Sequence, residues 1–114
     1  MAKIAAASTD GIHINEHFGR AAFFRIYELT DKSCDFLEVR DAVAVRQHMR
    51  EHDKSDFDRL VELLSDCDAV LAVRIGEGAA AYLIEKGLRV FEASGPIEAV
   101  LQHMRDRNFL ETIE

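Results

Sequence analysis

A change in hydrophobic periodicity divides this chain into two halves and constrains its fold more than any other feature. In the first forty residues, short apolar or alternating runs are separated by turn residues such as Asp10-Gly11, a pattern typical of strands. These runs are residues 4–8, 12–14, 23–29 and 34–40. The first half therefore predicts an antiparallel meander. The polar residues 41–53 indicate no particular element.

The second half has the periodicity of helices that alternate with strands. Its apolar residues recur at i, i+3, i+4 and i+7 in two places, first from Phe57 and again from Ile97. The three predicted helices begin after Ser55 or Asp56, run over 79–86 to end at Gly87, and run over 97–104 with Pro96 in the first turn. Two strands are predicted between them, at 69–73 and 88–91. A loose tail is predicted from Asp106. Such alternation favours right-handed parallel crossovers. We therefore expect a single α/β domain over residues 1–114, with a mixed sheet covered by helices.

The composition excludes several classes of protein. Apolar residues make up 48% of the 114 residues, but no run approaches the roughly 20 that a membrane span needs. The chain has 14 basic and 21 acidic residues, and its net charge of −7 argues against non-specific binding to nucleic acid. Cys34 and Cys67 are too few for a disulfide framework, and the first residues lack the apolar run of a signal peptide. We expect a cytoplasmic protein without a membrane or nucleic-acid partner.

The most informative side chains lie in the segment 15–20, which has the sequence NEHFGR. His17 offers an imidazole, a common metal ligand, and Arg20 offers a fixed cation that suits an anion. Together with nearby backbone N–H groups, these side chains suit an anionic ligand that contains a metal. The candidate ligand-binding residues are Asn15, His17, Phe18, Gly19 and Arg20, with Asn15 fixing the loop through its side chain. Alternatively, His17 caps the loop and Arg20 forms a surface ion pair.

A second motif, between a predicted strand and a predicted helix, offers a different function. Residues 76–81 have the sequence GEGAAA, which matches the form G-x-G-x-x-A of a dinucleotide-binding turn. Glu92 on the following strand is then a candidate partner for a ribose. However, Glu77 places a negative charge where a pyrophosphate would bind, so a tight turn packed with small residues is the simpler interpretation.

Other metal-ligating side chains are scattered along the chain. His48 and His52 are spaced as i, i+4, so on a helix both could hold a divalent metal or form a lid over an anion. The alternative is two solvated histidines in a charged segment. Cys34 is a further candidate iron ligand near a turn, whereas Cys67 opens an apolar strand and is expected to be buried.

Several blocks of the sequence occur together, in order, in a known family. They are residues 5–11, 14–21, 24–28, 67–71, 74–78, 83–87 and 97–101. Through these blocks the chain resembles the dinitrogenase iron–molybdenum cofactor biosynthesis family over nearly its whole length. The resemblance implies a ribonuclease H-like three-layer domain, with a mixed sheet of about five strands and helices on both faces. It also implies a carrier or scaffold for an iron–sulfur-type cofactor, with His17 of the HFG triplet as the favoured ligand.

The function that these observations favour is therefore binding rather than catalysis. The expected ligand is an anionic iron–sulfur-type cluster or an iron–molybdenum cofactor precursor, and the resemblance implies nitrogenase assembly proteins as partners. No spacing of Asp10, Glu28 and Asp68 makes a convincing set of catalytic carboxylates. The alternatives are a nucleotide-binding regulatory module that uses the Gly76–Gly78 turn and a protein-interaction domain without a ligand.

Overall fold

The strands and helices alternate much as the periodicity predicts. The computed structural model of the protein describes residues 1–43 and 55–110, and for residues 55–57 the backbone alone. The strands are β1 (Ala2–Ala7), β2 (His13–Ile14), β3 (Phe23–Leu29), β4 (Cys34–Asp41), β5 (Ala69–Ala72), β6 (Arg89–Glu92) and β7 (Gly95–Pro96). The helices are α2 (Ser55–Leu63), α3 (Glu77–Glu85) and α4 (Ile97–Asp106), together with the short 3-10 helix η1 (Phe18–Arg20).

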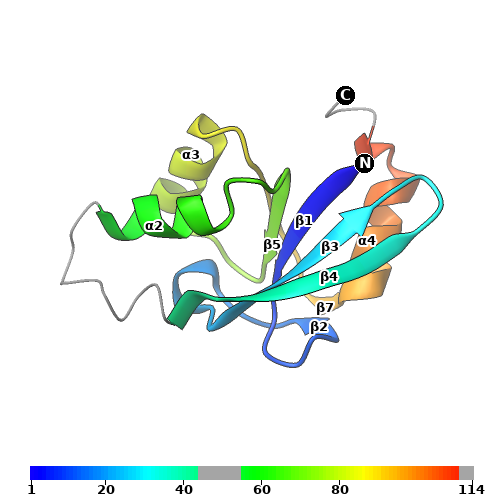
Figure 1. Ribbon diagram of the computed structural model, residues 1–114, viewed down its shortest axis with the longest axis horizontal. Helices are drawn as coiled ribbons and strands as arrows, with labels where there is room; N and C mark the ends of the chain where they lie inside the picture. The colour runs from blue at the N-terminus through cyan, green and yellow to red at the C-terminus, as the bar shows by residue number, and fades with distance from the viewer. Residues whose placement is uncertain (44–54, 111–114) are drawn as a thin grey trace.

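Five of the strands form one mixed sheet in the order β4-β3-β1-β5-β6. Figure 1 labels the first four of these, β4, β3, β1 and β5. Strand β1 pairs antiparallel with β3 and parallel with β5. The outer pairs are antiparallel β3–β4 and parallel β5–β6. The sheet therefore joins a meander from the first half to parallel crossovers from the second, which confirms the predicted mixed α/β architecture.

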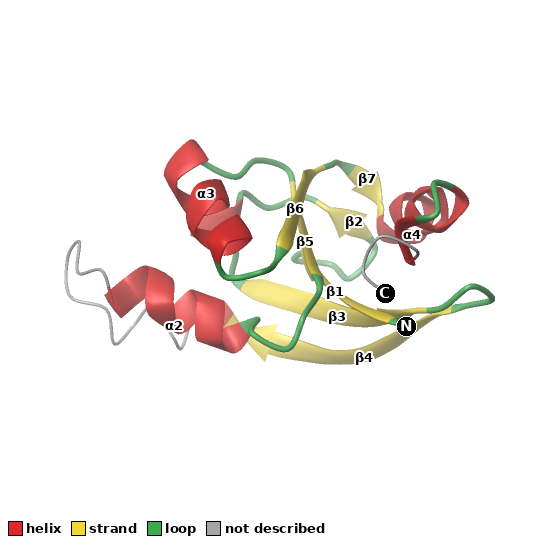
Figure 2. Ribbon diagram, turned by 90° about the horizontal axis from the view of Figure 1, so that it is seen from above, coloured by secondary structure: helices red, strands yellow, loops and turns green. Residues whose placement is uncertain are grey.

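Helices cover both faces of this sheet because its central strands are apolar on both sides. On one face, Leu60 and Leu64 of the α2 region and Leu83 of α3 pack with Ala5 and Val70. On the other face, residues of α4 pack with the alternate strand positions, Ile4, Ala6 and Leu71 among them. Figure 2 shows α2 and α3 on one side of the sheet and α4 on the other.

Strand β2 departs from the predicted meander. It leaves the main sheet and pairs antiparallel with β7, with Ile14 opposite Gly95 and His13 opposite Pro96. The backbone of Gly95 has φ +100°, a conformation that favours glycine and that permits this path. Pro96 is consequently extended and immediately precedes α4, rather than lying in its first turn. The pairing joins residues about eighty positions apart, so local periodicity does not reveal it.

The end of the described chain is more ordered than the expected loose tail. Phe109 is buried, and its ring packs edge-on against Phe91 with 5.6 Å between the ring centroids. Asn108 takes a positive φ of 59°, a left-handed conformation that asparagine tolerates, and so turns the chain after α4. The tail therefore adds an aromatic contact to the core on the α4 face.

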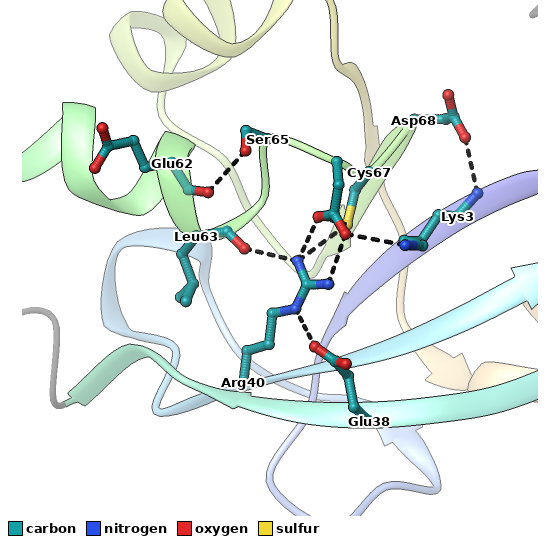
Figure 3. A network of polar contacts seen from close by, with 9 residues as sticks. Lys3, Glu38, Arg40, Glu62, Leu63, Ser65, Cys67 and Asp68 are labelled. Carbon is teal, nitrogen blue, oxygen red and sulfur yellow. Dashed lines mark hydrogen bonds and ion pairs between the residues drawn. The ribbon is translucent and has the colours of Figure 1, made fainter.

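A network of charged side chains, which we call the Arg40 cluster, ties β4 to the turn between α2 and β5 (Figure 3). The Arg40 guanidinium donates to both carboxylate oxygens of Asp66, at 2.5 and 2.8 Å, and to the carbonyl of Leu63 at 2.7 Å. It also pairs with Glu38 at 2.5 Å, while the Lys3 ammonium lies 3.0 Å from Asp66. The hydrogen bonds from Arg40 hold the pKa of Asp66 well below its usual range.

Cys67 lies against this cluster, and its thiol is buried as the sequence predicts. Its sulfur is 3.8 Å from an Arg40 nitrogen. Burial raises the pKa of Cys67 to about 12, so the thiol stays protonated at neutral pH. A thiol in that state is a poor metal ligand, since metals bind the thiolate.

Among residues 1–43 and 55–110, none of the helices combines the length and apolar character that crossing a membrane would require.

Candidate functional site

The candidate site lies at the carboxyl ends of two neighbouring parallel strands, β1 and β5. After β1, the chain turns back so that the N–H groups of Asn15 and Glu16 donate to the carbonyl of Ala7, at 3.2 and 3.4 Å. The carbonyl of Glu16 then accepts the N–H of Val73, just beyond β5, at 2.9 Å. In open α/β sheets, ligands bind beyond the carboxyl ends of the strands. They bind at the point where the connections from two neighbouring strands run to opposite sides of the sheet. Segment 15–20 occupies this position.

Asn15 fixes the loop with its side chain, as the sequence predicts. Its Oδ1 accepts the N–H of Thr9 at 3.0 Å, and its Nδ2 donates to the Thr9 hydroxyl at 2.8 Å. The oxygen and the nitrogen of the side-chain amide thus both bind Thr9 and hold the base of the loop together. Asn15 is not among the residues that line the groove described below, so its geometry supports a positioning role.

Phe18 anchors the same loop in the core. Its side chain is 1% exposed and packs on Phe24 with 5.7 Å between the ring centroids. Its backbone N–H donates to the carbonyl of Arg74 at 2.9 Å. The expectation that this N–H faces a ligand is therefore wrong, because a carbonyl of the protein already occupies it. Phe18 positions its neighbours instead.

A groove of about 710 Å³ opens beside this anchor. Three of the predicted ligand-binding residues line it, namely His17, Gly19 and Arg20. The remaining lining residues come from the segment after β5, from the start of α3 and from β6: Arg74, Ile75, Gly76, Glu77, Ala80, Val90 and Glu92. The structure thus brings together three segments that are far apart in the sequence.

His17 is exposed at the start of η1 and does not cap it. The side chain makes no capping hydrogen bond, whereas its backbone carbonyl accepts the N–H of Arg20 at 3.1 Å. The alternative in which the imidazole serves as a loop cap is therefore wrong. The imidazole is exposed on the groove wall, carried by a loop that two anchors fix.

The Gly76 turn, which carries the alternative nucleotide motif, lies in the same groove. Gly76 precedes α3 without a side-chain cap. The carboxylate of Glu92, the expected ribose partner, instead accepts the N–H of Ile75 at 2.9 Å. Glu77 lines the groove at the start of α3. The structure therefore assigns Glu92 to holding the 74–76 connection.

The other predicted metal ligands do not join this groove within the described chain. Cys34 is half-buried at the start of β4 and lines a different cavity, on the α4 side of the sheet. His48 and His52 lie outside the described residues. Among residues 1–43 and 55–110, no three His, Cys, Asp or Glu side chains converge in a way that could hold a metal ion. Within that part of the chain, His17 is the histidine that lines the groove.

Arg74 is the groove residue that sequence reasoning missed as a candidate. It is exposed beside the 15–20 segment, although 57 positions separate it from His17. Its position directly after a buried strand was the available signal, because strand ends at this edge of a sheet collect ligand-binding residues. With Arg74 included, the groove carries two arginines and two glutamates, so its formal charge is neutral in a protein of net charge −7.

Comparisons with known proteins identify the family. A sequence model described as "Dinitrogenase iron-molybdenum cofactor" matches residues 1–107. Protein NifX from Rhodobacter capsulatus is 29% identical over 108 residues, which are 90% of this chain and 67% of that protein. The FeMo cofactor biosynthesis protein NifB from Frankia alni is 35% identical over 91 residues, which are 78% of this chain. The match spans only 18% of that longer protein.

Solved structures share the same fold at low sequence identity. The apo form of the orange protein from Desulfovibrio gigas has a TM-score of 0.68 at 19% identity, over 93% of this chain and 88% of that one. The structure of PH0822 has a TM-score of 0.67 at 20% identity, over 91% and 88% of the two chains. The sequence match over residues 1–107 confirms the resemblance seen in the ordered motif blocks. The chain belongs to the dinitrogenase iron–molybdenum cofactor family.

Proposed function

We propose that this protein is a non-catalytic carrier or scaffold for an anionic iron–sulfur-type cluster or an iron–molybdenum cofactor precursor. The observation that carries the proposal is the groove, where His17 lies with Arg20 and Arg74 at the carboxyl edge of the sheet. Family membership supports the same cargo, because relatives are named for FeMo cofactor biosynthesis. Proteins of nitrogenase cofactor assembly are the partners that this role requires.

His17 would bind the cluster by ligand exchange at iron. A neutral imidazole nitrogen donates its lone pair to one iron and displaces one terminal thiolate, which takes a proton from solvent. No electron is transferred, and the bound cluster becomes less negative by one charge. Arg20 would then stabilise the remaining negative charge, as guanidinium groups do for anions.

The proposal also includes the fold class, a single domain and a location in the cytoplasm. The strand order, with an antiparallel meander on one side of β1 and parallel strands on the other, supports a ribonuclease H-like class. The five-stranded sheet contains strands from both halves of the chain, which supports a single domain over residues 1–114. Cys34 and Cys67 form no disulfide, as in a reducing cytoplasm.

The nucleotide-binding alternative is less well supported by the same groove. Its motif does line the groove through Gly76, but Glu92 already accepts a backbone N–H, and Glu77 would repel a pyrophosphate. Saturable binding of a dinucleotide to the metal-free protein would favour this alternative over the carrier.

The test uses a dianionic synthetic [4Fe–4S] cluster capped by four thiolates, presented to the protein without oxygen. We expect the parent to retain iron after gel filtration and His17→Ala to lose most of it. His103→Ala is the matched control, because His103 is exposed on α4, which covers the other face of the sheet from α3. Equal iron retention in parent and His17→Ala would remove His17 from the site. Failure of the parent to retain iron, whatever the variant does, would count against the carrier itself.

Stability provides a second readout on the same variants. His17→Ala should change the free energy of unfolding by less than about 1 kcal/mol, because an exposed side chain contributes little to the core. If His17→Ala unfolds the protein instead, His17 has a structural role.

A further inference from the structure

Arg74 is held directly beside His17 by the backbone. Two hydrogen bonds connect their segments, one from the Val73 N–H to the Glu16 carbonyl and one from the Phe18 N–H to the Arg74 carbonyl, both at 2.9 Å. The first bond lies just before His17 and the second just after it. Side chains on adjacent backbone segments joined in this way come within reach of the same ligand.

The Arg74 side chain is exposed and lines the groove. Within residues 1–43 and 55–110, it forms no ion pair with a carboxylate. Arg40 differs, because its guanidinium is saturated by Asp66, Glu38 and a carbonyl. An exposed guanidinium beside a candidate metal ligand can donate charge-assisted hydrogen bonds to an anion.

Glu92 fixes the connection that carries Arg74. Its carboxylate, at the end of β6, accepts the N–H of Ile75, the residue that follows Arg74, at 2.9 Å. The connection is therefore held on both sides, by the bond to Phe18 and by the bond to Glu92. Holding the backbone here limits the positions that the guanidinium can reach.

We infer that Arg74 is a second anion-contacting residue of the groove and that Glu92 is its positioning residue. The inference rests on the proposed carrier function and assigns these two residues to its cargo. The ligand class is a metal cluster whose sulfide or thiolate atoms, next to the iron bound by His17, carry negative charge. Arg74 contacts those atoms, and Glu92 sets the place of Arg74 through the backbone.

The two roles of Glu92 oppose each other. Its oxygen holds the 74–76 connection, but its negative charge lies in the same groove as the anion. Glu92→Gln keeps a carbonyl oxygen that can accept the Ile75 N–H and removes the charge. Glu92→Ala removes both. The structure thus predicts that Glu92→Gln binds the anion more tightly than the parent, whereas Glu92→Ala loses part or all of this gain.

The first experiment measures affinity for the dianionic synthetic [4Fe–4S] cluster at low and high salt. We expect Arg74→Gln to bind about tenfold more weakly at low salt, the loss of a charged hydrogen bond, with a smaller difference at high salt. Arg107→Gln is the matched control, because it removes the same charge from an exposed site at the end of α4. If Arg74→Gln and Arg107→Gln bind alike while the parent binds, the assignment of Arg74 is overturned and the carrier function stands.

The second experiment separates positioning from folding. We expect Glu92→Gln to bind the cluster several-fold more tightly than the parent and Glu92→Ala to bind more weakly than Glu92→Gln. Thermal unfolding measured in parallel identifies a variant that is merely unfolded. If Glu92→Ala binds as tightly as Glu92→Gln at unchanged stability, the positioning role assigned to Glu92 is overturned. If the parent does not bind the cluster at all, the carrier proposal fails instead.

Discussion

The Arg40 cluster and the groove beside His17 contain similar residue types but are built differently. In the Arg40 cluster, a guanidinium that is 14% exposed meets Asp66, Glu38 and a carbonyl within hydrogen-bonding distance. In the groove, the exposed side chains of His17 and Arg74 face solvent, while backbone hydrogen bonds and the buried Phe18 hold their segments in place. In the first region the charges bind each other. In the second, hydrogen bonds of the backbone hold the segments, and the side chains of His17 and Arg74, the proposed contacts to a ligand, remain exposed.

The comparison separates stability from function. Charged groups that form hydrogen bonds with one another stabilise the folded protein. Side chains that are held in place by their backbone but have no such partners can bind a ligand with little rearrangement. Substitutions in the Arg40 cluster should therefore change unfolding but not binding. Substitutions of the exposed groove side chains should do the opposite.

The largest expected effect on stability lies inside the loop of the groove, at Phe18. Phe18→Ala should lower the free energy of unfolding by about 3–5 kcal/mol, because it deletes a fully buried ring and leaves a cavity against Phe24. Urea denaturation measures this loss. A loss no larger than that of His17→Ala would mean that the loop is not anchored by the core, and the contrast between neighbouring residues would disappear.

Arg40→Ala should have an intermediate effect. We expect a loss of about 2 kcal/mol, since the substitution removes charge-assisted hydrogen bonds to Asp66 and the hydrogen bond to the Leu63 carbonyl. Iron retention from the synthetic cluster should equal that of the parent. Arg107→Ala, at an exposed site, is the control for the loss of one positive charge. Impaired iron retention in folded Arg40→Ala would break the separation between the two regions.

The smallest effect is a change in the acid side of the stability profile. Hydrogen bonds from Arg40 depress the pKa of Asp66 in the folded state. The stability that this carboxylate contributes is thus present above the unfolded value of about 3.9 and is lost as the pH falls toward the lower folded value. Asp66→Asn should make the fall in stability below pH about 4 shallower than in the parent.

Asp31→Asn, in the exposed turn between β3 and β4, is the control for this pH experiment. The acid slope should not vanish in Asp66→Asn, because Asp10 also has a depressed pKa, held by hydrogen bonds from His13 and Ile12. Thermal unfolding at a series of pH values gives the slopes. Parallel profiles for the parent and Asp66→Asn would show that the Arg40 pair does not stabilise the fold.

Most of the fold could be predicted from the sequence because the hydrophobic periodicity of each element is visible in its own residues. The run of residues 23–29 became β3, and the helical spacing from Ile97 became α4 with almost the expected bounds. The pairing of β2 with β7 and the burial of Phe109 could not be predicted, since both depend on contacts between distant segments. Periodicity reports which face of an element is apolar and not which partner covers it.

The site shows the same limit. The NEHFGR segment was found because unusual residue types gather in one short loop, and the structure places three of them in the groove. Arg74 looked ordinary in the sequence, and the Gly76 turn looked like the site of a rival function. Only the fold shows that both lie beside His17. Phe18 was assigned to the ligand because nothing local indicates that its N–H bonds to a carbonyl 56 residues away.

The three-segment construction of the groove has a consequence for biosynthesis. His17 is synthesised early, but its neighbours Arg74 and Glu92 emerge from the ribosome much later. Contacts of such long sequence separation form late, after the intervening chain has folded. A nascent chain therefore exposes His17 before the rest of the groove exists. The proposed binding groove is complete only after β6 has been synthesised, so incomplete chains should not bind the cluster.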